Sequence, residues 1–359
     1  MARTAYMFGA GASYACSSKT PVITKFFSLA KTVGGLCEKI RADITAKLVQ
    51  DIGLDESRLL NGSDDLEKVF SLVSMNGEMR RILGEEVVEG AAEFEAAFLQ
   101  QRLESFVYEL LMTVTEKELK GTGDLYDQLL KSTDKDDSFM TFNYDLQLDR
   151  AFERVFKWTP ETGYGFPFTK LLKADASWHN ASSKKGDQIL LKLHGSLNWL
   201  YSSGYIHRPL NTLDFDKKYA GRHYLAEPLY RFPAETAFGM NLSVPDNGIE
   251  IIIQLNIVPP TLRKQLVKES ENESLRDIWK LGHETLTKAE RIVAIGYSLP
   301  ATDFHAEWLL RTSILKSQHQ KIDLVVVNPD NTVVQRFVST FGGKLGKVGV
   351  YPTFEDFLK

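Results

Sequence analysis

The sequence predicts an α/β fold: a Rossmann-like, mostly parallel sheet with a helical insertion and a smaller loop-rich insertion. Several short apolar runs end abruptly in small or polar residues, which is typical of buried parallel strands that deliver loops to a site. About a hundred residues with helical spacing separate the first of these runs from the second. A chain of 359 residues can bury a large core, either as one domain with inserted segments or as two domains.

Five apolar runs are expected to form the strands of this sheet. They are Thr4 to Phe8 before GAGAS, Phe139 to Phe142 before NYD, Ile189 to Leu193 before HGS, Arg291 to Ile295 before GYSLP, and Ile322 to Val327 before Asn328, Pro329 and Asp330. In an open α/β sheet the ligand lies beyond the carboxyl ends of the strands. We therefore expect the five loops to converge on one crevice.

Residues 30–133 are expected to form the helical insertion. Apolar residues recur there at the i, i+3, i+4, i+7 spacing of one helix face, at Leu66, Val69, Phe70 and Val73. A second apolar stripe runs through Phe94, Phe98, Leu99, Leu103, Phe106 and Val107. Residues 63–65, Ser-Asp-Asp, supply N-cap chemistry before the first stripe, with Glu67 in the first turn.

The remaining residues, 1–29 and 134–359, are expected to form the nucleotide-binding core domain. Within it, residues 201–247 are rich in Tyr, Pro, Gly and Asn with weak periodicity, which indicates the loop-rich insertion.

Composition narrows the classes of function. A hydrophobic share of 43% and a charged share of 25% are those of an ordinary globular protein, and the net charge of −4 argues against a nucleic acid as the direct ligand. The N-terminus has no secretory signal and no apolar run reaches the roughly 20 residues of a membrane span. With only two cysteines, Cys16 and Cys37, we expect a cytoplasmic protein without a disulfide framework.

The segment Gly9-Ala10-Gly11-Ala12-Ser13 follows the first expected strand. Glycines there let a backbone turn tightly and approach a pyrophosphate at a helix N-terminus. The third glycine of the dinucleotide fingerprint would fall on Tyr14, and no second strand ending in Asp or Glu follows about 20 residues later. A hydride-transfer dehydrogenase is therefore disfavoured, and a plain strand-to-helix turn stays open.

The strand-end residues Asn143 and Asp145 stand two positions apart, so a persisting strand pleat would point both the same way. An amide can orient a hydroxyl or water, and a carboxylate can accept from the carboxamide of nicotinamide. The alternative is a turn with Asx hydrogen bonds. His194 ends another strand and is a candidate general base, although a lone histidine is more often structural. The GYSLP turn after residue 295 and the Asn328 turn support no claim in isolation.

The order GAGAS, TFNYD, LHGS, GYS, VVN resembles the pattern of sirtuin-type (silent-information-regulator-type) NAD-consuming domains, most closely those of bacterial antiphage defence proteins. The segments DLEKVF, VPPT and TFEDFL extend the resemblance over nearly the whole chain. It implies a diphosphate held by the GAGAS loop, nicotinamide ribose and carboxamide at Asn143 and Asp145, His194 as catalytic base, and Ser298 and Asn328 on the adenosine side. The candidate cofactor-binding residues are Gly9, Ala10, Gly11, Ala12, Ser13, Gly195, Gly296, Ser298 and Asn328.

One departure decides between branches of the family. Deacylase sirtuins carry a four-cysteine zinc module after the HG motif, whereas no cysteine follows Cys37 here. The resemblance therefore implies an NAD⁺ hydrolase (NADase) that uses NAD⁺ as substrate, with no metal expected, acting as effector of an abortive-infection defence system. Four alternatives stay open: an NAD-dependent protein deacylase, an ADP-ribosyltransferase, a non-catalytic subunit that senses NAD⁺ or a related nucleotide, and a scaffold subunit of a larger defence complex.

An unregulated NADase would deplete its own host, so we expect control by assembly or by a partner. The segment from Tyr219 to Phe238 combines aromatic residues with Arg222 and Arg231, a composition enriched in interface cores. The equal alternative is that these aromatics pack the segment onto its own domain. We expect a homo-oligomer with no membrane association, and the family resemblance suggests a HerA-like translocase ATPase or another defence subunit as partner.

Overall fold

The computed structural model describes residues 3–17, 20–83, 91–119, 124–182, 186–205, 222–227, 242–246, 249–261 and 273–359. A six-stranded sheet with the order β12-β11-β10-β1-β2-β5 lies at its centre, and every neighbouring pair in it is parallel. Its strands are β1 (Thr4–Phe8), β2 (Ser138–Thr141), β5 (Leu190–Lys192), β10 (Arg291–Ile295), β11 (Ile322–Val327) and β12 (Leu345–Tyr351). The parallel sheet confirms the predicted α/β class, and β1, β10 and β11 have the bounds that the apolar runs indicated.

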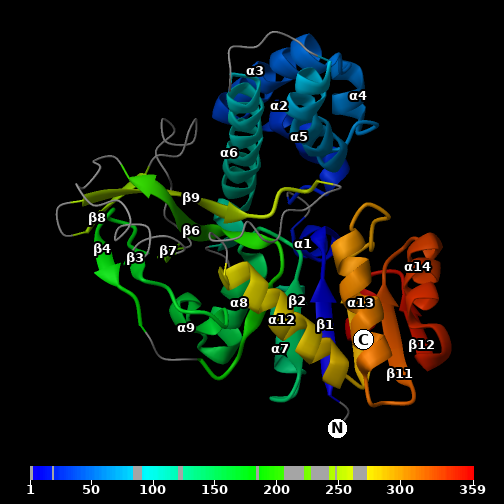
Figure 1. Ribbon diagram of the computed structural model, residues 1–359. Helices are drawn as coiled ribbons and strands as arrows, with labels where there is room; N and C mark the ends of the chain where they lie inside the picture. The colour runs from blue at the N-terminus through cyan, green and yellow to red at the C-terminus, as the bar shows by residue number, and fades with distance from the viewer. Residues whose placement is uncertain are drawn as a thin grey trace.

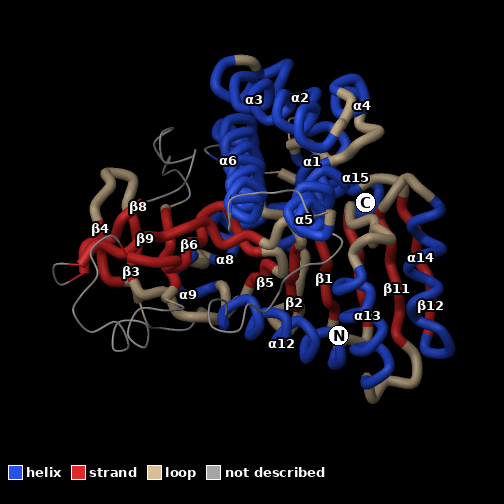
Figure 2. Tube along the Cα trace, turned by 45° about the horizontal axis from the view of Figure 1, so that its top comes forward, coloured by secondary structure: helices blue, strands red, loops and turns tan. Residues whose placement is uncertain are grey.

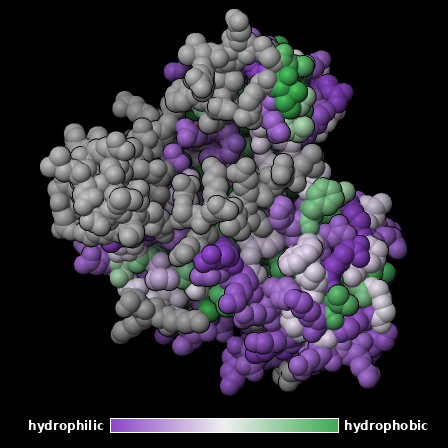
Figure 3. Space-filling view, viewed as in Figure 1, coloured by the Kyte–Doolittle hydropathy of each residue, from purple (hydrophilic) through white to green (hydrophobic). Residues whose placement is uncertain are grey.

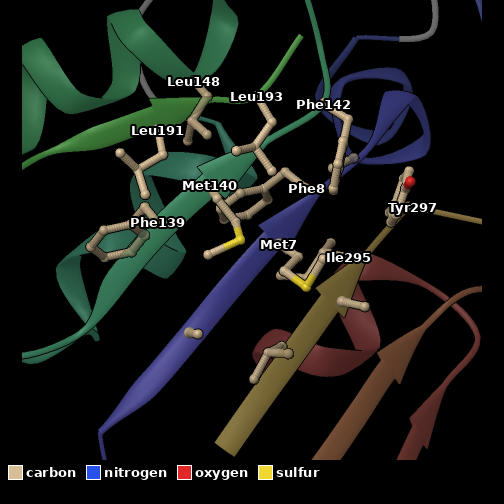
Figure 4. Packing of buried hydrophobic residues seen from close by; sticks show 14 of the residues in the cluster. Met7, Phe8, Phe139, Met140, Phe142, Leu148, Leu191, Leu193, Ile295 and Tyr297 are labelled. Carbon is tan, nitrogen blue, oxygen red and sulfur yellow. The ribbon is translucent and has the colours of Figure 1, made fainter. Parts of the chain in front are cut away.

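The chain builds this sheet outward from its middle in two directions. From β1 it runs through β2 to β5 on one side, and β10, β11 and β12 then extend the other side. The two halves therefore diverge between β1 and β10, which is the topological switch point where open α/β sheets bind ligands. Figure 4 shows the buried side chains on this part of the sheet, with Met7 and Phe8 of β1 beside Met140 of β2 and Ile295 of β10.

Helices cover the parallel sheet. They are α1 (Ala10–Cys16), α7 (Leu125–Lys131), α8 (Gln147–Phe156), α12 (Glu273–Lys288), α13 (Phe304–Lys316), α14 (Asn331–Phe341) and α15 (Phe354–Leu358), with a short helix α9 (Pro160–Gly163). In Figure 1, α12 crosses in front of β1 and β2 and packs against α13, while α7 contacts α1, α8 and α15. Residues 342–344 form a 3₁₀ turn between α14 and β12.

A group of helices lies above the carboxyl edge of the sheet (Figures 1 and 2). It contains α2 (Phe26–Val33), α3 (Gly35–Ile52), α4 (Glu56–Asn61), α5 (Leu66–Ile82) and α6 (Ala91–Leu119), preceded by a 3₁₀ turn at Ile23–Lys25. The stripe expected on α5 is buried, and Asp65 caps the helix by accepting from Lys68 N at 2.9 Å. Phe98 of the second stripe is instead 41% exposed, with the Arg102 guanidinium 5.8 Å from its ring centre.

A second six-stranded sheet was not expected. Its order is β4-β3-β7-β6-β9-β8, and its strands are β3 (Lys170–Leu172), β4 (Trp178–Asn180), β6 (Gly195–Tyr205), β7 (His223–Ala226), β8 (Leu242–Asp246) and β9 (Ile249–Ile257). The stretch 201–247 thus contributes the end of β6, β7 and β8 rather than loops alone. Strand β7 has only four residues and pairs with β3 and β6, so its position is set by tertiary contacts and leaves little periodicity in the local sequence.

The aromatic segment expected at an interface lies mostly outside the described residues, which include only 222–227 of it. Tyr224 is 1% exposed and belongs to the core beneath the second sheet, so this aromatic packs inward. Most of the described surface in Figure 3 is hydrophilic, with separate small apolar groups. Within the described part of the chain, no helix has the length and apolar character needed to cross a bilayer.

Candidate functional site

A cavity of about 660 Å³ opens at the carboxyl ends of the parallel strands. Loops after β1, β2, β10, β11 and β12 line it, together with His194 after β5. Its other wall comes from residues 20–24, Phe26, Leu66, Glu67 and Leu111, which belong to the helical group or lead into it. The prediction that the five strand-end loops converge on one crevice is therefore confirmed.

Most of the candidate site residues reach this cavity. Those that line it are Gly9, Ala10, Gly11, Asn143, Asp145, His194, Gly296, Ser298 and Asn328. Three candidates lie behind the wall instead: Ala12 and Ser13 are buried in α1, and Gly195 pairs with Ile257 of β9. Gly195 has φ +82°, and a Cβ there would lie 2.1 Å from Asn256 O, so its glycine is required by the approach of β9.

The two glycine loops pack backbone against backbone. Gly11 N donates to Gly296 O at 2.9 Å and Gly9 N donates to Ile295 O at 3.1 Å. A Cβ on Gly11 would lie 2.9 Å from both Cα and O of Gly296, and Gly296 itself has φ +61°. These glycines therefore permit the contact between the β1 and β10 loops, in addition to any approach to a ligand. Since Ala12 N also donates to Gly9 O at 2.9 Å, three N–H groups of the GAGAS loop are already used within the protein.

Asn143 joins the loop after β2 to the loop after β1. Its Nδ2 donates to Gly9 O at 2.9 Å and to Ser13 Oγ at 3.0 Å, while its backbone N donates to Thr141 Oγ1 at 3.0 Å. The Ser13 hydroxyl also lies 3.0 Å from the Tyr126 hydroxyl. Both amide hydrogens of Asn143 are thus occupied, which leaves its Oδ1 as the acceptor for a hydroxyl or water.

Asp145 is 5% exposed, and its Oδ1 accepts from Gln147 N at 3.0 Å. Burial raises the pKa of this carboxyl, while Lys192, the Gln147 N–H and the Ser13 hydroxyl lower it. Asn143 and Asp145 both contact Ser13. The strand has already ended at Thr141, and the bond from Gln147 N to Asp145 is the Asx hydrogen bond of the alternative interpretation.

Lys192 lies beneath this loop and was not foreseen. Its side chain is 0% exposed, and its Nζ donates to Asp145 O at 2.5 Å, to Asp149 Oδ2 at 2.9 Å and to Tyr144 O at 3.5 Å. Tyr164 donates its hydroxyl to the other oxygen of Asp149, and Asn198 Nδ2 donates to Tyr164 OH at 3.3 Å. A buried polar network thus fixes the backbone that carries Asn143 and Asp145. The only sequence signal was a lysine inside an apolar strand.

His194 is 7% exposed and enclosed by aromatic rings. Phe142 meets its ring edge-on at a centroid distance of 5.1 Å, and the Trp279 ring lies at 6.4 Å with an interplanar angle of 28°. The backbone carbonyl of His194 accepts from Val258 N at 2.8 Å, which holds this turn against the residues after β9. The imidazole is therefore held within a rigid wall of the cavity.

A carboxylate that the candidate set omitted faces this imidazole. Asp303 Oδ2 lies 3.6 Å from His194 Nε2, and Asp303 is 2% exposed. Its Oδ2 accepts from Tyr297 OH at 2.8 Å, and its Oδ1 caps α13 by accepting from Ala306 N at 3.3 Å. In the sequence, Asp303 follows the GYSLP turn and precedes a helical run. Its local sequence is that of an ordinary helix N-cap, so it did not indicate a site residue.

Two tyrosines complete this end of the cavity. Tyr297 stacks on Phe142 at 4.0 Å, and Tyr144 OH donates to Val258 O at 2.6 Å. Burial raises the pKa of both hydroxyls well above the ordinary tyrosine value, and the carboxylates of Asp303 and Glu67 add to the effect. Both hydroxyls therefore stay protonated, and two carboxylates lie close enough to influence them.

The cavity wall is acidic. Glu67, Asp145, Asp303 and Glu355 line it, and no lysine or arginine occurs among the described residues of its lining. Glu67 is 7% exposed and comes from α5, so the helical group contributes a carboxylate to the cavity. This wall suits a ligand that carries positive charge at the Asp145 end, because a carboxylate lowers the free energy of a nearby cation.

The other half of the cavity lies on the β11 and β12 side of β1. There Asn328 Oδ1 accepts from Asp330 N at 3.0 Å, and Asn328 N donates to Tyr351 O at 2.9 Å. Ser298 and Thr353 line the same end. The sheet order thus separates Asn328 and His194 to opposite sides of the switch point, as an elongated ligand would require. Among the described residues, no group of three or more His, Cys, Asp or Glu side chains is arranged to hold a metal ion.

No protein-family model matches the chain, and no curated protein sequence matches it. Solved structures that resemble it include a Sir2 homologue in complex with NAD, at a TM-score of 0.43 and 11% identity over 99% of this chain and 86% of that one. Another is Sir2 with the inhibitor EX-527, 2′-O-acetyl-ADP-ribose and a deacetylated p53 peptide, at a TM-score of 0.40 and 13% identity over 99% and 90%. Because these TM-scores and sequence identities are low, the α/β class is assigned from the strand order of this structure. The NAD, inhibitor and peptide ligands are those of the other proteins.

Proposed function

We propose that the cavity binds NAD⁺ and that the protein hydrolyses its nicotinamide–ribose bond. The observation that carries the proposal is that Asn143, Asp145 and His194, from the ends of two adjacent strands, line one cavity at the switch point of the sheet. The cavity volume of about 660 Å³ lies within the range of small-molecule sites. The acidic wall supports a substrate whose nicotinamide ring is cationic.

In the proposed reaction, the bond between the ring nitrogen and ribose C1′ breaks, and its electron pair stays with nicotinamide, which leaves neutral. The ribosyl centre develops oxocarbenium character, which nearby carboxylates stabilise. Water adds to C1′ and loses one proton, so the products are ADP-ribose, nicotinamide and a proton. A ribose hydroxyl as the nucleophile would give a cyclic product with the same balance.

Each residue has a role in this proposal. Asn143 accepts at Oδ1 from the ribose hydroxyl or the attacking water, because its two N–H groups already bind Gly9 and Ser13. Asp145 accepts from the carboxamide, and His194 accepts the proton from the nucleophile. The diphosphate lies against the Gly9 to Gly11 loop, and the adenosine lies beside Ser298 and Asn328.

The proposal is tested by incubating the protein with NAD⁺ and measuring nicotinamide and ADP-ribose. His194→Ala is expected to lower turnover at least about a hundredfold, the size of general acid–base contributions. Asn143→Ala is expected to have an effect of about the same size, because it removes a hydrogen-bonding group that positions the reacting atoms. His179→Ala is the matched control, since His179 is exposed on β4 and does not line the cavity. Full turnover in a folded His194→Ala protein would refute the assignment of the base.

The same assay separates the alternatives. A deacylase would release nicotinamide only with an acylated peptide, and an ADP-ribosyltransferase would attach label from NAD⁺ to a protein. Binding of NAD⁺ without cleavage under all conditions would indicate a sensing subunit.

We further propose that the hydrolase acts in antiphage defence, in the cytoplasm, and that a homo-oligomer or a partner such as a HerA-like ATPase controls it. The reasoning is the toxicity of unrestrained NAD⁺ cleavage. Light scattering combined with NADase assays over a dilution series tests the assembly. A monomer of constant specific activity, indifferent to the products of neighbouring genes, would contradict it.

A further inference from the structure

The site holds a buried carboxylate, Asp303, that the proposed reaction does not use directly. Its Oδ2 lies 3.6 Å from His194 Nε2, within ion-pair range and slightly beyond a direct hydrogen bond. Such distances are common in unliganded active sites and shorten when substrate binds. The contact joins the loop after β10 to the turn after β5, which are on opposite sides of β1 and β2 in the sheet.

Two hydrogen-bond donors fix the Asp303 carboxylate. Tyr297 donates to the same Oδ2 at 2.8 Å, and Ala306 N donates to Oδ1 at 3.3 Å. Tyr297 is in turn stacked on Phe142, and Phe142 meets the His194 ring edge-on. The carboxylate and the imidazole are therefore held by one connected set of side chains, so their relative position is built into the fold.

We propose that Asp303 is the positioning residue of His194: its carboxylate orients the imidazole and stabilises the imidazolium ion that forms when His194 accepts the proton from the attacking oxygen. The assignment of a proton acceptor rests on the proposed NAD⁺ hydrolysis, whereas the contact between the two side chains does not. A buried carboxylate that orients a histidine and stabilises its protonated form is an established device in nucleophilic catalysis. The proton balance is unchanged, because Asp303 keeps its charge throughout.

The capping role of Asp303 allows a clean substitution. Asparagine is as good an N-cap as aspartate, so Asp303→Asn keeps the cap of α13 while removing the charge that faces His194. Asp330→Asn is the matched control: Asp330 caps α14 at the same edge of the sheet by accepting from Thr332 N at 2.8 Å, and it does not line the cavity. Asp303→Ser provides a second cap-preserving variant should the asparagine protein fold poorly.

The kinetic test measures nicotinamide release. Asp303→Asn is expected to lower kcat at least about tenfold with KM changed less than about twofold, since the residue acts on the base rather than on ground-state binding. Asp330→Asn is expected to match the wild type. A folded Asp303→Asn protein with wild-type kcat would overturn the proposal, as would a change in KM alone.

A second test does not depend on turnover. In protein labelled with ¹⁵N-histidine, the ring nitrogen resonances of His194 are assigned by their loss in His194→Ala. Asp303→Asn is expected to shift them and Asp330→Asn to leave them in place. The other titratable side chains at this end of the cavity are Glu67, Tyr144, Asp145 and Tyr297, so Glu67→Gln serves to separate the direct contact from the general charge of the wall.

Shifts confined to Asp303→Asn support the positioning role. Unchanged resonances in that variant, or equal shifts in Glu67→Gln, would overturn it. If the wild-type protein does not cleave NAD⁺, the proposed function fails, and the resonances still decide whether Asp303 positions His194.

Discussion

Replacing Lys192 with methionine tests how the buried network holds the candidate site. The ammonium group is 0% exposed and its ion pair with Asp149 is equally buried. Methionine fills a similar volume but leaves Asp149 as a buried carboxylate without its cation and removes the donor to Tyr144 O and Asp145 O. Breaking a buried ion pair in this way costs about 3–5 kcal/mol. Because Tyr164 still donates to Asp149, we expect a loss near the lower end, about 3 kcal/mol.

The assay is thermal unfolding together with nicotinamide release. For a chain of this size, 1 kcal/mol shifts the midpoint by a little over 1 °C, so Lys192→Met should unfold about 4 °C lower. The control is Lys68→Met, because Lys68 is 46% exposed and its ion pair with Asp64 should contribute less than about 1 kcal/mol. The double variant Lys192→Met, Asp149→Leu should recover part of the lost unfolding free energy, because the Asp149 carboxylate is then no longer buried without its cation. A Lys192→Met protein as stable as Lys68→Met, with full activity, would refute the reasoning.

Three further predictions concern the glycine contact at Gly11, the buried His223 and the zinc content of the protein. Gly11→Ala should destabilise the fold by about 1–3 kcal/mol as well as weaken NAD⁺ binding, because its Cβ would meet Gly296 at 2.9 Å. Gly343→Ala, which meets nothing within 4 Å, is the control, and equal melting temperatures of the two variants would contradict the packing argument. Burial lowers the pKa of His223 from 6.5 to about 4, so the unfolded chain binds a proton that the folded chain excludes, and stability is lost as pH falls from about 6.5 towards 4. Urea unfolding at several pH values measures this loss of unfolding free energy. Up to about 3 kcal/mol of it should disappear in His223→Gln but not in His179→Gln. The same dependence of stability on pH in both variants would contradict the prediction. Elemental analysis should find no stoichiometric zinc, and a chelator should leave the melting temperature unchanged, because only two cysteines occur in the sequence. One tightly held zinc per chain would reopen the deacylase alternative.

The parallel sheet and the location of the cavity could be predicted because both depend on local sequence. Buried parallel strands are continuous apolar runs, and the polar residues at their ends must lie at one edge once the strands pair. That reasoning placed Asn143, Asp145 and His194 together without any knowledge of the helices between them. It missed β12, because its sequence LGKVGVY has glycines and a lysine where an interior strand would have apolar residues, as an edge strand permits.

The support of the site could not be predicted, because each supporting contact joins residues far apart in the chain. Lys192 meets Asp149 across 43 positions, and Asn143 meets Gly9 across 134. Asp303 is an ordinary helix cap by its local sequence, and only the folded sheet brings it to His194. The packing roles of Gly11 and Gly195 were missed for the same reason, since the backbone that approaches each comes from another strand.

The helical group is part of the cavity as well as an addition to the sheet. Leu66 and Glu67 of α5 and Leu111 of α6 line the cavity opposite the strand-end loops. The same two helices share a core with the second sheet, through residues such as Val69, Leu110 and Leu255. A displacement of α5 would therefore move the Glu67 carboxylate relative to the strand-end loops on the opposite wall of the cavity. We propose that the controlling partner contacts the helical group, because it would then act on the cavity wall opposite His194.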